Sequence, residues 1–241
     1  MATKLELERE THVLETLDAL QRAGIELVVV GGYAVDAYAP HRFSVDLDVV
    51  VRKQDLQRIA SKLEQLGYKH ARSRDDFAKS YKGEFQSFIK QLEGGRVSVD
   101  LLVNCLCSRS TSACWSFDYI KKHSVMRLVS GIARSVEAVV PSRELLAAMK
   151  IHSGRLTDLR DLVMLSLGPD VQAIVRHSLR GDRQALKATA RKMLIRMGKQ
   201  DFRDALKGTF SIQRGRVVEK EMASAASLLE ALESSGVKQG F

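Results

Sequence analysis

The chain has 241 residues, of which 45% are hydrophobic, and its 38 Lys and Arg against 29 Asp and Glu give a formal net charge of +9. This composition excludes a disordered chain and suits one large domain or two small ones. The positive charge favours polyanionic partners such as nucleotides or nucleic acid. A charged N-terminus and the lack of an apolar run of about 20 residues predict a cytoplasmic protein without a membrane segment.

The first half of the sequence alternates helical and strand patterns around a Gly-Gly pair. In chain order it predicts a helix over 5–23, a strand over 25–30 that stops at Gly31-Gly32, a short helix over 34–39, a strand over 45–51 and a helix over 54–66. After Gly67 it predicts strands over 68–73, 78–82, 85–92 and 97–103, then a hairpin of 125–128 with 136–140.

The second half changes character at Pro141. Apolar residues at a period of 3.6 predict helices over 142–152, 156–167 and 171–179, and the remaining sequence is helical too. We therefore expect an α+β fold: a mixed β-sheet core with flanking helices over 1–140, then a helical C-terminal domain over 141–241. Between Asp182 and Lys220, eleven Lys and Arg oppose four acidic residues, either as a solvated helix face or as a contact for a phosphate backbone.

Two carboxylates stand two residues apart in the apolar strand 45–51. Because side chains alternate along a strand, Asp46 and Asp48 lie on one face and the apolar residues between them on the other. Asp100 has the same parity in the strand 97–103. An unpaired ionised carboxylate in such a setting costs several kcal/mol unless a cation accompanies it, so the three together predict a metal site. The alternative is an edge strand whose carboxylates face water.

Nucleotidyl transfer uses such a carboxylate set. Asp46 and Asp48 would hold two Mg²⁺ ions, with Mn²⁺ as the alternative metal, and Asp100 would bind the catalytic ion or act as a base. Gly31 and Gly32 allow the backbone to approach a triphosphate closely, and the N–H groups that open the following short helix would donate to its phosphate oxygens.

The ordered set of Gly31-Gly32, Asp46-Leu47-Asp48 and Asp100 resembles the signature of the nucleotidyltransferase superfamily that includes DNA polymerase beta. Within it, the run from Arg42 through Ser44 to Asp48 looks like the motif of the AbiEii/MenT-type toxins. The resemblance implies a mixed-sheet nucleotidyltransferase core and an NTP substrate. Arg42 and Ser44 are expected to brace the metal-binding loop beside the nucleotide.

The helical half is similar to the same group of enzymes. Its segments 145–150 and 155–162 look like the Leu-Leu-x-x-Lys and Arg-x-x-Asp-x-x-Asp-Leu helices of that group. By this resemblance Lys150 contacts the triphosphate, and Asp158 or Asp161 supplies a further acidic position near the nucleotide. Thr157 departs from the Lys that is common there. For Lys150 the alternative is a snorkelling side chain on an apolar helix face.

Three functions are compatible with this pattern. The first is Mg²⁺-dependent transfer of a nucleoside monophosphate from an NTP to an acceptor hydroxyl, and resemblance to the toxins extends it to the 3′ end of tRNA or other RNA and to an antitoxin protein as partner. The second is a non-catalytic nucleotide- or RNA-binding protein. The third keeps the transfer reaction but uses a small molecule such as an aminoglycoside, or a protein side chain, as the acceptor.

Cysteine and histidine residues add no second predicted site. Cys105, Cys107 and Cys114 lack the spacing of a zinc site and are expected to be reduced thiols. The six histidines are scattered along the chain, and only His41, beside the acidic motif, is singled out for a functional role.

Overall fold

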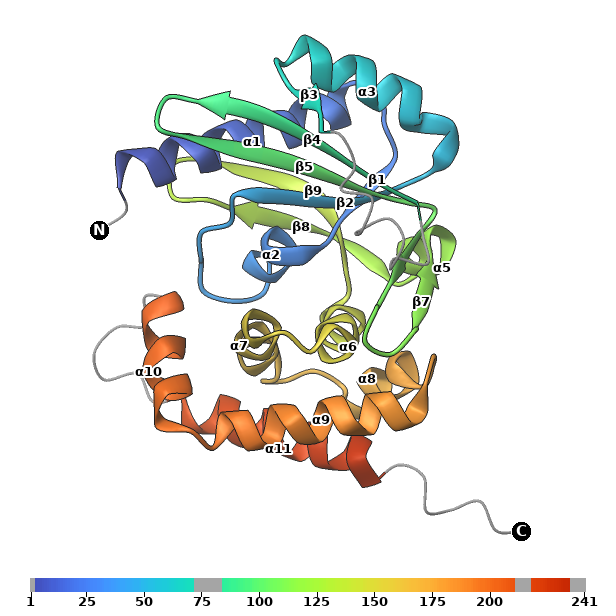
Figure 1. Cartoon of the computed structure of the whole chain (residues 1–241), viewed down its shortest axis with the longest axis vertical. Helices are drawn as coiled ribbons and strands as arrows, with labels where there is room; N and C mark the ends of the chain where they lie inside the picture. Colours follow the sequence, from blue (N-terminus) through green and yellow to red (C-terminus); the bar gives the residue numbers. More distant parts are fainter. Residues whose placement is uncertain (1–2, 72–83, 211–217, 235–241) are drawn as a thin grey trace. The chain divides into compact units, whose positions relative to one another are not determined.

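The computed structural model describes residues 3–71, 84–210 and 218–234 (Figure 1). The chain forms two compact units. The core unit comprises Met1–Ala37, His41–Cys107 and Trp115–Ser142, and the helical unit comprises Tyr38–Pro40, Ser108–Cys114 and Arg143–Phe241. Within the described ranges, no helix has the length and apolar character needed to cross a membrane.

A five-stranded mixed sheet is the centre of the core unit (Figure 1). The strand order is β1 (Leu27–Val29), β2 (Asp46–Val51), β5 (Gly95–Val103), β4 (Glu84–Leu92) and β3 (Lys69–His70). β2 runs parallel to β5, and the other neighbours pair antiparallel. Leu47, Val49 and Val99 are fully buried, as the alternating pattern predicts. The predicted α+β class is therefore confirmed.

The helices predicted for the core unit are present close to their predicted ranges. They are α1 (Lys4–Arg22), α2 (Gly31–Asp36), the 3-10 turn η1 (Lys53–Asp55) and α3 (Leu56–Gln65). α1 begins with a capping box, in which the Thr3 hydroxyl accepts from the Glu6 amide and the Glu6 carboxylate accepts from the Thr3 amide. α2 begins at Gly31, three residues before the predicted start, and Val30 caps it without a side-chain hydrogen bond.

Several short elements differ from the prediction. The hairpin of β8 (Ser124–Ser130) and β9 (Ser135–Pro141) is confirmed, whereas β6 (Cys105–Cys107), β7 (Cys114–Ser116) and α5 (Phe117–Lys122) were not predicted. A helix of six residues is too short to show a 3.6-residue period. The predicted strand 78–82 lies outside the described residues, and β3 is the described strand within 68–73.

The helical unit contains six helices within its described residues. They are α6 (Arg143–Ser153), α7 (Leu156–Leu165), α8 (Val171–Ser178), α9 (Arg183–Met197), α10 (Gln200–Thr209) and α11 (Glu219–Ser234). α6 packs against α7 and α8, and α9 packs against α11. The Asp182 side chain caps α9 by accepting from the amides of Gln184 and Ala185.

The cysteines correct the expectation of three reduced thiols. Cys107 and Cys114 are each disulfide-bonded, whereas Cys105 keeps its thiol. The expectation rested on the reducing compartment predicted for the chain and on the spacing of the cysteines, and neither reports which cysteines are oxidised in the folded protein.

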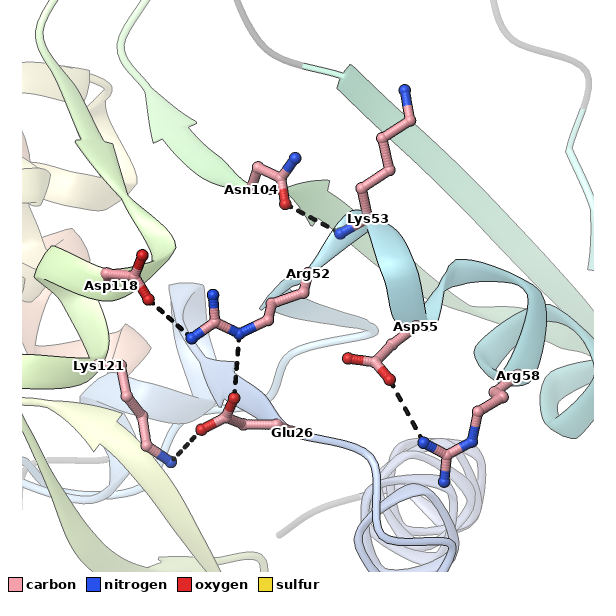
Figure 2. A network of polar contacts seen from close by, with 8 residues as sticks. All are labelled: Glu26, Arg52, Lys53, Asp55, Arg58, Asn104, Asp118 and Lys121. Atoms are coloured by element: carbon pink, nitrogen blue, oxygen red, sulfur yellow. Dashed lines mark hydrogen bonds and ion pairs between the residues drawn. The ribbon is translucent and has the colours of Figure 1, made fainter.

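A polar network joins strand ends of the core unit (Figure 2). Arg52, directly after β2, donates to Glu26 at 3.1 Å and to Asp118 at 2.7 Å. Lys121 on α5 pairs with Glu26 at 3.4 Å, and the Arg52 guanidinium lies 4.4 Å from the centre of the Phe117 ring. The network therefore connects α5 to the C-terminal end of β2, whereas Asp46 lies at the N-terminal end of this strand.

Candidate active site

Three carboxylates lie on one face of the parallel strands β2 and β5. The register pairs Asp48 with Asp100 and Asp46 with Ser98. Paired residues of neighbouring strands point to the same side of a sheet, so the predicted common face is confirmed. Asp46 is exposed, and Asp48 and Asp100 are half-buried, so none of the three residues is enclosed in the core.

Two serines that the sequence did not single out support this face. The Ser98 hydroxyl donates to Asp46 Oδ1 at 2.5 Å, and the Ser87 hydroxyl on β4 donates to Asp100 Oδ1 at 2.6 Å. A hydrogen bond donated to a carboxylate stabilises its ionised form, which is the form that binds a cation. The shared strand parity of Ser98 and Asp100 is a signal that could have identified Ser98.

The electrostatics of Asp100 suit a bound cation. Burial raises the pKa of Asp100 from its usual range, the Ser87 hydrogen bond partly opposes this, and the negative charge of Asp46 raises it further. A divalent cation would relieve both the burial of this charge and its repulsion from Asp46. Within residues 3–71, 84–210 and 218–234, no three His, Cys, Asp or Glu side chains gather closely enough to hold a metal ion.

Gly31 lies directly beneath the Asp48 carboxylate. Its φ of +67° is in the left-handed region, and a Cβ added to it would lie 2.0 Å from Asp48 Oδ2. The Val30 amide also donates to the Asp48 carbonyl at 2.9 Å, which holds the two segments together. Only glycine adopts this left-handed φ without strain and also leaves room for the Asp48 carboxylate. The position of Asp48 therefore requires a glycine at position 31.

We expect Gly31→Ala to lower transfer activity about 100-fold, because the new Cβ would displace the Asp48 carboxylate by an ångström or more. Gly24→Ala is the matched control, since Gly24 has a φ of +69° and its added Cβ would meet no atom closer than 3.8 Å. Both variants should lose about 1–2 kcal/mol of unfolding free energy through backbone strain. Equal activity in the two variants would contradict the role given to Gly31.

Arg42 and Ser44 lie against the second glycine. A Cβ on Gly32 would be 3.0 Å from the Ser44 hydroxyl and 3.1 Å from the Arg42 guanidinium. The Tyr33 hydroxyl donates to the Ser44 carbonyl at 2.9 Å, and the Arg42 amide donates to Asp36 Oδ1 at 3.2 Å. Residues of α2 thus hold the segment before β2 beside the Gly-Gly turn.

Lys150 lies in the helical unit between two buried carboxylates. Its ammonium is 2.7 Å from Asp161 Oδ2 and 3.1 Å from Asp158 Oδ1, and all three side chains are almost fully buried. Although burial raises the pKa of Asp158, the Lys150 ammonium and the Arg155 guanidinium lower it to about 2. The snorkelling alternative for Lys150 is therefore wrong, because its charge is buried and paired.

The predicted site residues fall into two groups. Asp46, Asp48 and Asp100 with the Gly-Gly turn, Arg42 and Ser44 belong to the core unit, whereas Lys150, Asp158 and Asp161 form a cluster of their own in the helical unit. The triphosphate contact assigned to Lys150 stays a prediction.

Residues 12–125 match the family model of aminoglycoside-2''-adenylyltransferase. The match covers slightly less than half of the chain and includes the Gly-Gly turn and all three carboxylates of the core unit. It supports the nucleotidyltransferase superfamily and a nucleotidyltransferase enzyme, the class that the sequence predicts. No curated protein matches the chain by sequence.

Solved structures that resemble the chain share little sequence with it. JHP933 from Helicobacter pylori is 12% identical, covering 97% of this chain and 94% of its own, with a TM-score of 0.49. The lincosamide antibiotic adenylyltransferase LnuA, bound to lincomycin, is 19% identical, covering 66% and 96%, with a TM-score of 0.44. ANT(2")-Ia with adenylyl-2"-tobramycin is 12% identical, covering 74% and 96%, with a TM-score of 0.47. Similarity at this level identifies no substrate for this chain.

Proposed function

We propose that this chain transfers a nucleoside monophosphate from an NTP to an acceptor hydroxyl and releases pyrophosphate. The observation that carries the proposal is the common face of Asp46, Asp48 and Asp100 beside the Gly31 turn. In the reaction, the bond from the acceptor oxygen to the α-phosphorus forms while the bond from that phosphorus to the pyrophosphate oxygen breaks.

Asp46, Asp48 and Asp100 would supply carboxylate ligands for Mg²⁺, or for Mn²⁺ as the alternative; because they share a face without gathering into a metal-holding cluster in the described residues, their side chains would have to turn toward the ion as it binds. Carboxylate oxygens are the ligands that these hard cations prefer, and the raised pKa of Asp100 marks a place where added positive charge is favourable. Bound metal would acidify the acceptor hydroxyl and neutralise the charge of the leaving pyrophosphate.

The chain's own groups bind the triphosphate and accept the proton. Because Gly31 and Gly32 have no side chains, phosphate oxygens could approach the backbone amides of this turn closely. The Arg42 guanidinium beside the turn could pair with the same oxygens. Asp100 has a second candidate role, as the acceptor of the hydroxyl proton, because burial raises its pKa.

The first candidate acceptor is a small hydroxylated molecule. This assignment rests on the family match over residues 12–125, because the matched enzymes adenylate an aminoglycoside hydroxyl. The match does not extend over the helices from Arg143 onward, so it leaves the helical unit without a role. The formal net charge of +9 for the whole chain also disfavours a cationic acceptor relative to a neutral or anionic one.

The second candidate acceptor is an RNA 3′ end, to which the toxin role and an antitoxin partner belong. Its supporting observation is a set of exposed or half-exposed cations on α9, at the N-cap of α10 and within α10 that make no ion pair with a carboxylate within 4.0 Å among the residues the structure describes. They are Arg183, Lys187, Lys192, Lys199, Arg203 and Lys207. Arg203 and Lys207 are four residues apart and share one face of α10, and Lys199, the N-cap residue, stands four residues before Arg203 at the start of this helix.

Replacing Lys199, Arg203 and Lys207 together by Ala separates the two acceptors. If RNA is bound here, its affinity should fall and the slope of log affinity against log salt should decrease by about 2, because single-stranded phosphate contacts contribute about 0.7 each. Transfer to a small acceptor should be unchanged. The control replaces Lys53 and Lys121, which pair with Glu84 and Glu26. If the triple variant still transfers nucleotide and its RNA affinity has the same salt dependence as the parent's, the result would favour the small-molecule acceptor.

A further inference from the structure

A buried carboxyl group outside the carboxylate face contacts two segments of the core unit that are distant in sequence. Glu10 on α1 is 1% exposed. Its Oε1 pairs with His41 Nε2, and its Oε2 accepts from the Ile132 amide at 2.6 Å. A Cβ added to Gly131 would lie 2.5 Å from this carboxylate, so the turn between β8 and β9 closes directly over it.

The His41 imidazole is the side chain that pairs with the Glu10 carboxyl group within the described part of the chain. A buried carboxyl group that loses a hydrogen-bond partner is destabilised, so Glu10 and His41 constrain each other. The His41 ring is 24% exposed and packs edge-to-face on Phe43, with 5.0 Å between the ring centres. The imidazole therefore fixes Phe43 from one side and Glu10 from the other.

The segment that His41 begins also carries the side chains placed against the nucleotide-binding turn. Arg42 and Ser44 follow it immediately and lie 3.0–3.1 Å from the position of a Cβ on Gly32. On the other side of this segment, the Tyr33 hydroxyl holds the Ser44 carbonyl. The Glu10–His41 pair is thus the anchor at one end of residues 41–44, and Tyr33 is the anchor at the other.

We propose that Glu10 and His41 are positioning residues for the nucleotide, holding residues 41–44 so that Arg42 and Ser44 stay against the Gly31-Gly32 turn. The inference rests on the proposed function and adds a specific role to it: the pair acts on triphosphate binding and leaves the acceptor site alone. It also gives α1 and the β8–β9 turn a part in nucleotide affinity.

The test compares His41→Ala with two matched variants. His70→Ala is the control, because His70 also packs edge-to-face on a phenylalanine, Phe88, at 5.0 Å, and lies on the exposed strand β3. Glu10→Gln is the conservative variant, because its amide can still accept from Ile132 and donate to an unprotonated His41 nitrogen. The dissociation constant of Mg-ATP, measured by calorimetry, is combined with the KM values of both substrates and with the Tm.

We expect His41→Ala to raise the dissociation constant and KM of the nucleotide about tenfold, and to leave the acceptor KM within about twofold of the parent. Glu10→Gln should stay within about threefold of the parent, and His70→Ala should match it. A parent-like nucleotide affinity in His41→Ala would overturn the proposal, as would a rise in both KM values together with a large loss of Tm.

Amide hydrogen exchange of residues 41–45 keeps this test independent of the proposed function. Exchange in that segment should be faster in His41→Ala than in the parent and unchanged in His70→Ala. If the parent itself binds no nucleotide, the proposed function fails, and unchanged exchange in His41→Ala would then overturn the positioning role separately.

Discussion

Replacing Lys150 by Met is expected to lower the unfolding free energy by about 3–5 kcal/mol, because it leaves buried carboxylates without their ammonium. Lys150 contacts Asp158 at 3.1 Å and Asp161 at 2.7 Å, and both carboxylates are 1% exposed. Denaturant unfolding of the parent and the variant measures the loss directly.

The matched control adds Asp158→Asn and Asp161→Asn to Lys150→Met. Because this triple variant removes the buried charges as well as the cation, it should recover most of the lost stability. The pKa of Asp158 is lowered to about 2, so its contribution is present above its ordinary pKa of 3.8 and is lost as the pH falls toward 2. A stability loss below about 1 kcal/mol in Lys150→Met would show that the cluster is not structural.

Asp48→Asn is expected to lower kcat/KM for nucleotidyl transfer by about 10³-fold, since removing a metal ligand forfeits roughly 4 kcal/mol of transition-state stabilisation. Asp48 lies beside Asp100 in the register and above Gly31, and Asn is nearly isosteric, so folding should be retained. Steady-state rates over a range of Mg²⁺ concentrations give the loss and its metal dependence.

Asp118→Asn serves as the carboxylate control for this experiment. Asp118 is 76% exposed and pairs with Arg52 in the network of Figure 2. A surface pair contributes at most about 1 kcal/mol to stability, and the residue is not part of the carboxylate face, so activity should stay within about twofold of the parent. Comparable losses in the two variants would point to a folding effect and against a metal ligand.

Elements with strong periodicity could be predicted from the sequence. The apolar stripe of α1 and the alternation of β2 and β5 gave correct elements within a few residues, because burial of one face imposes the period. β6, β7 and α5 were missed, since three to six residues carry too little pattern. The early start of α2 was missed because Val30 provides no side-chain cap to mark it.

The carboxylate face was predictable because strand parity is a local property. The hydrogen bond that the Ser87 hydroxyl donates to Asp100 was not predictable. Ser87 lies on β4, and the register between β4 and β5 depends on the whole sheet. The sequence similarly identified Lys150, Asp158 and Asp161 as notable, but their mutual pairing depends on how α6 packs against α7. Residues were therefore easier to find than the contacts that define what they do.

The most direct test of the central claim uses labelled NTP, Mg²⁺, and separate pools of small hydroxylated acceptors, RNA and protein, with the parent chain and Asp48→Asn side by side. We expect metal-dependent labelling of one pool and pyrophosphate release by the parent, with about 10³-fold less of both in Asp48→Asn. Equal labelling by the two proteins, or nucleotide binding by the parent without transfer to any pool, would contradict it.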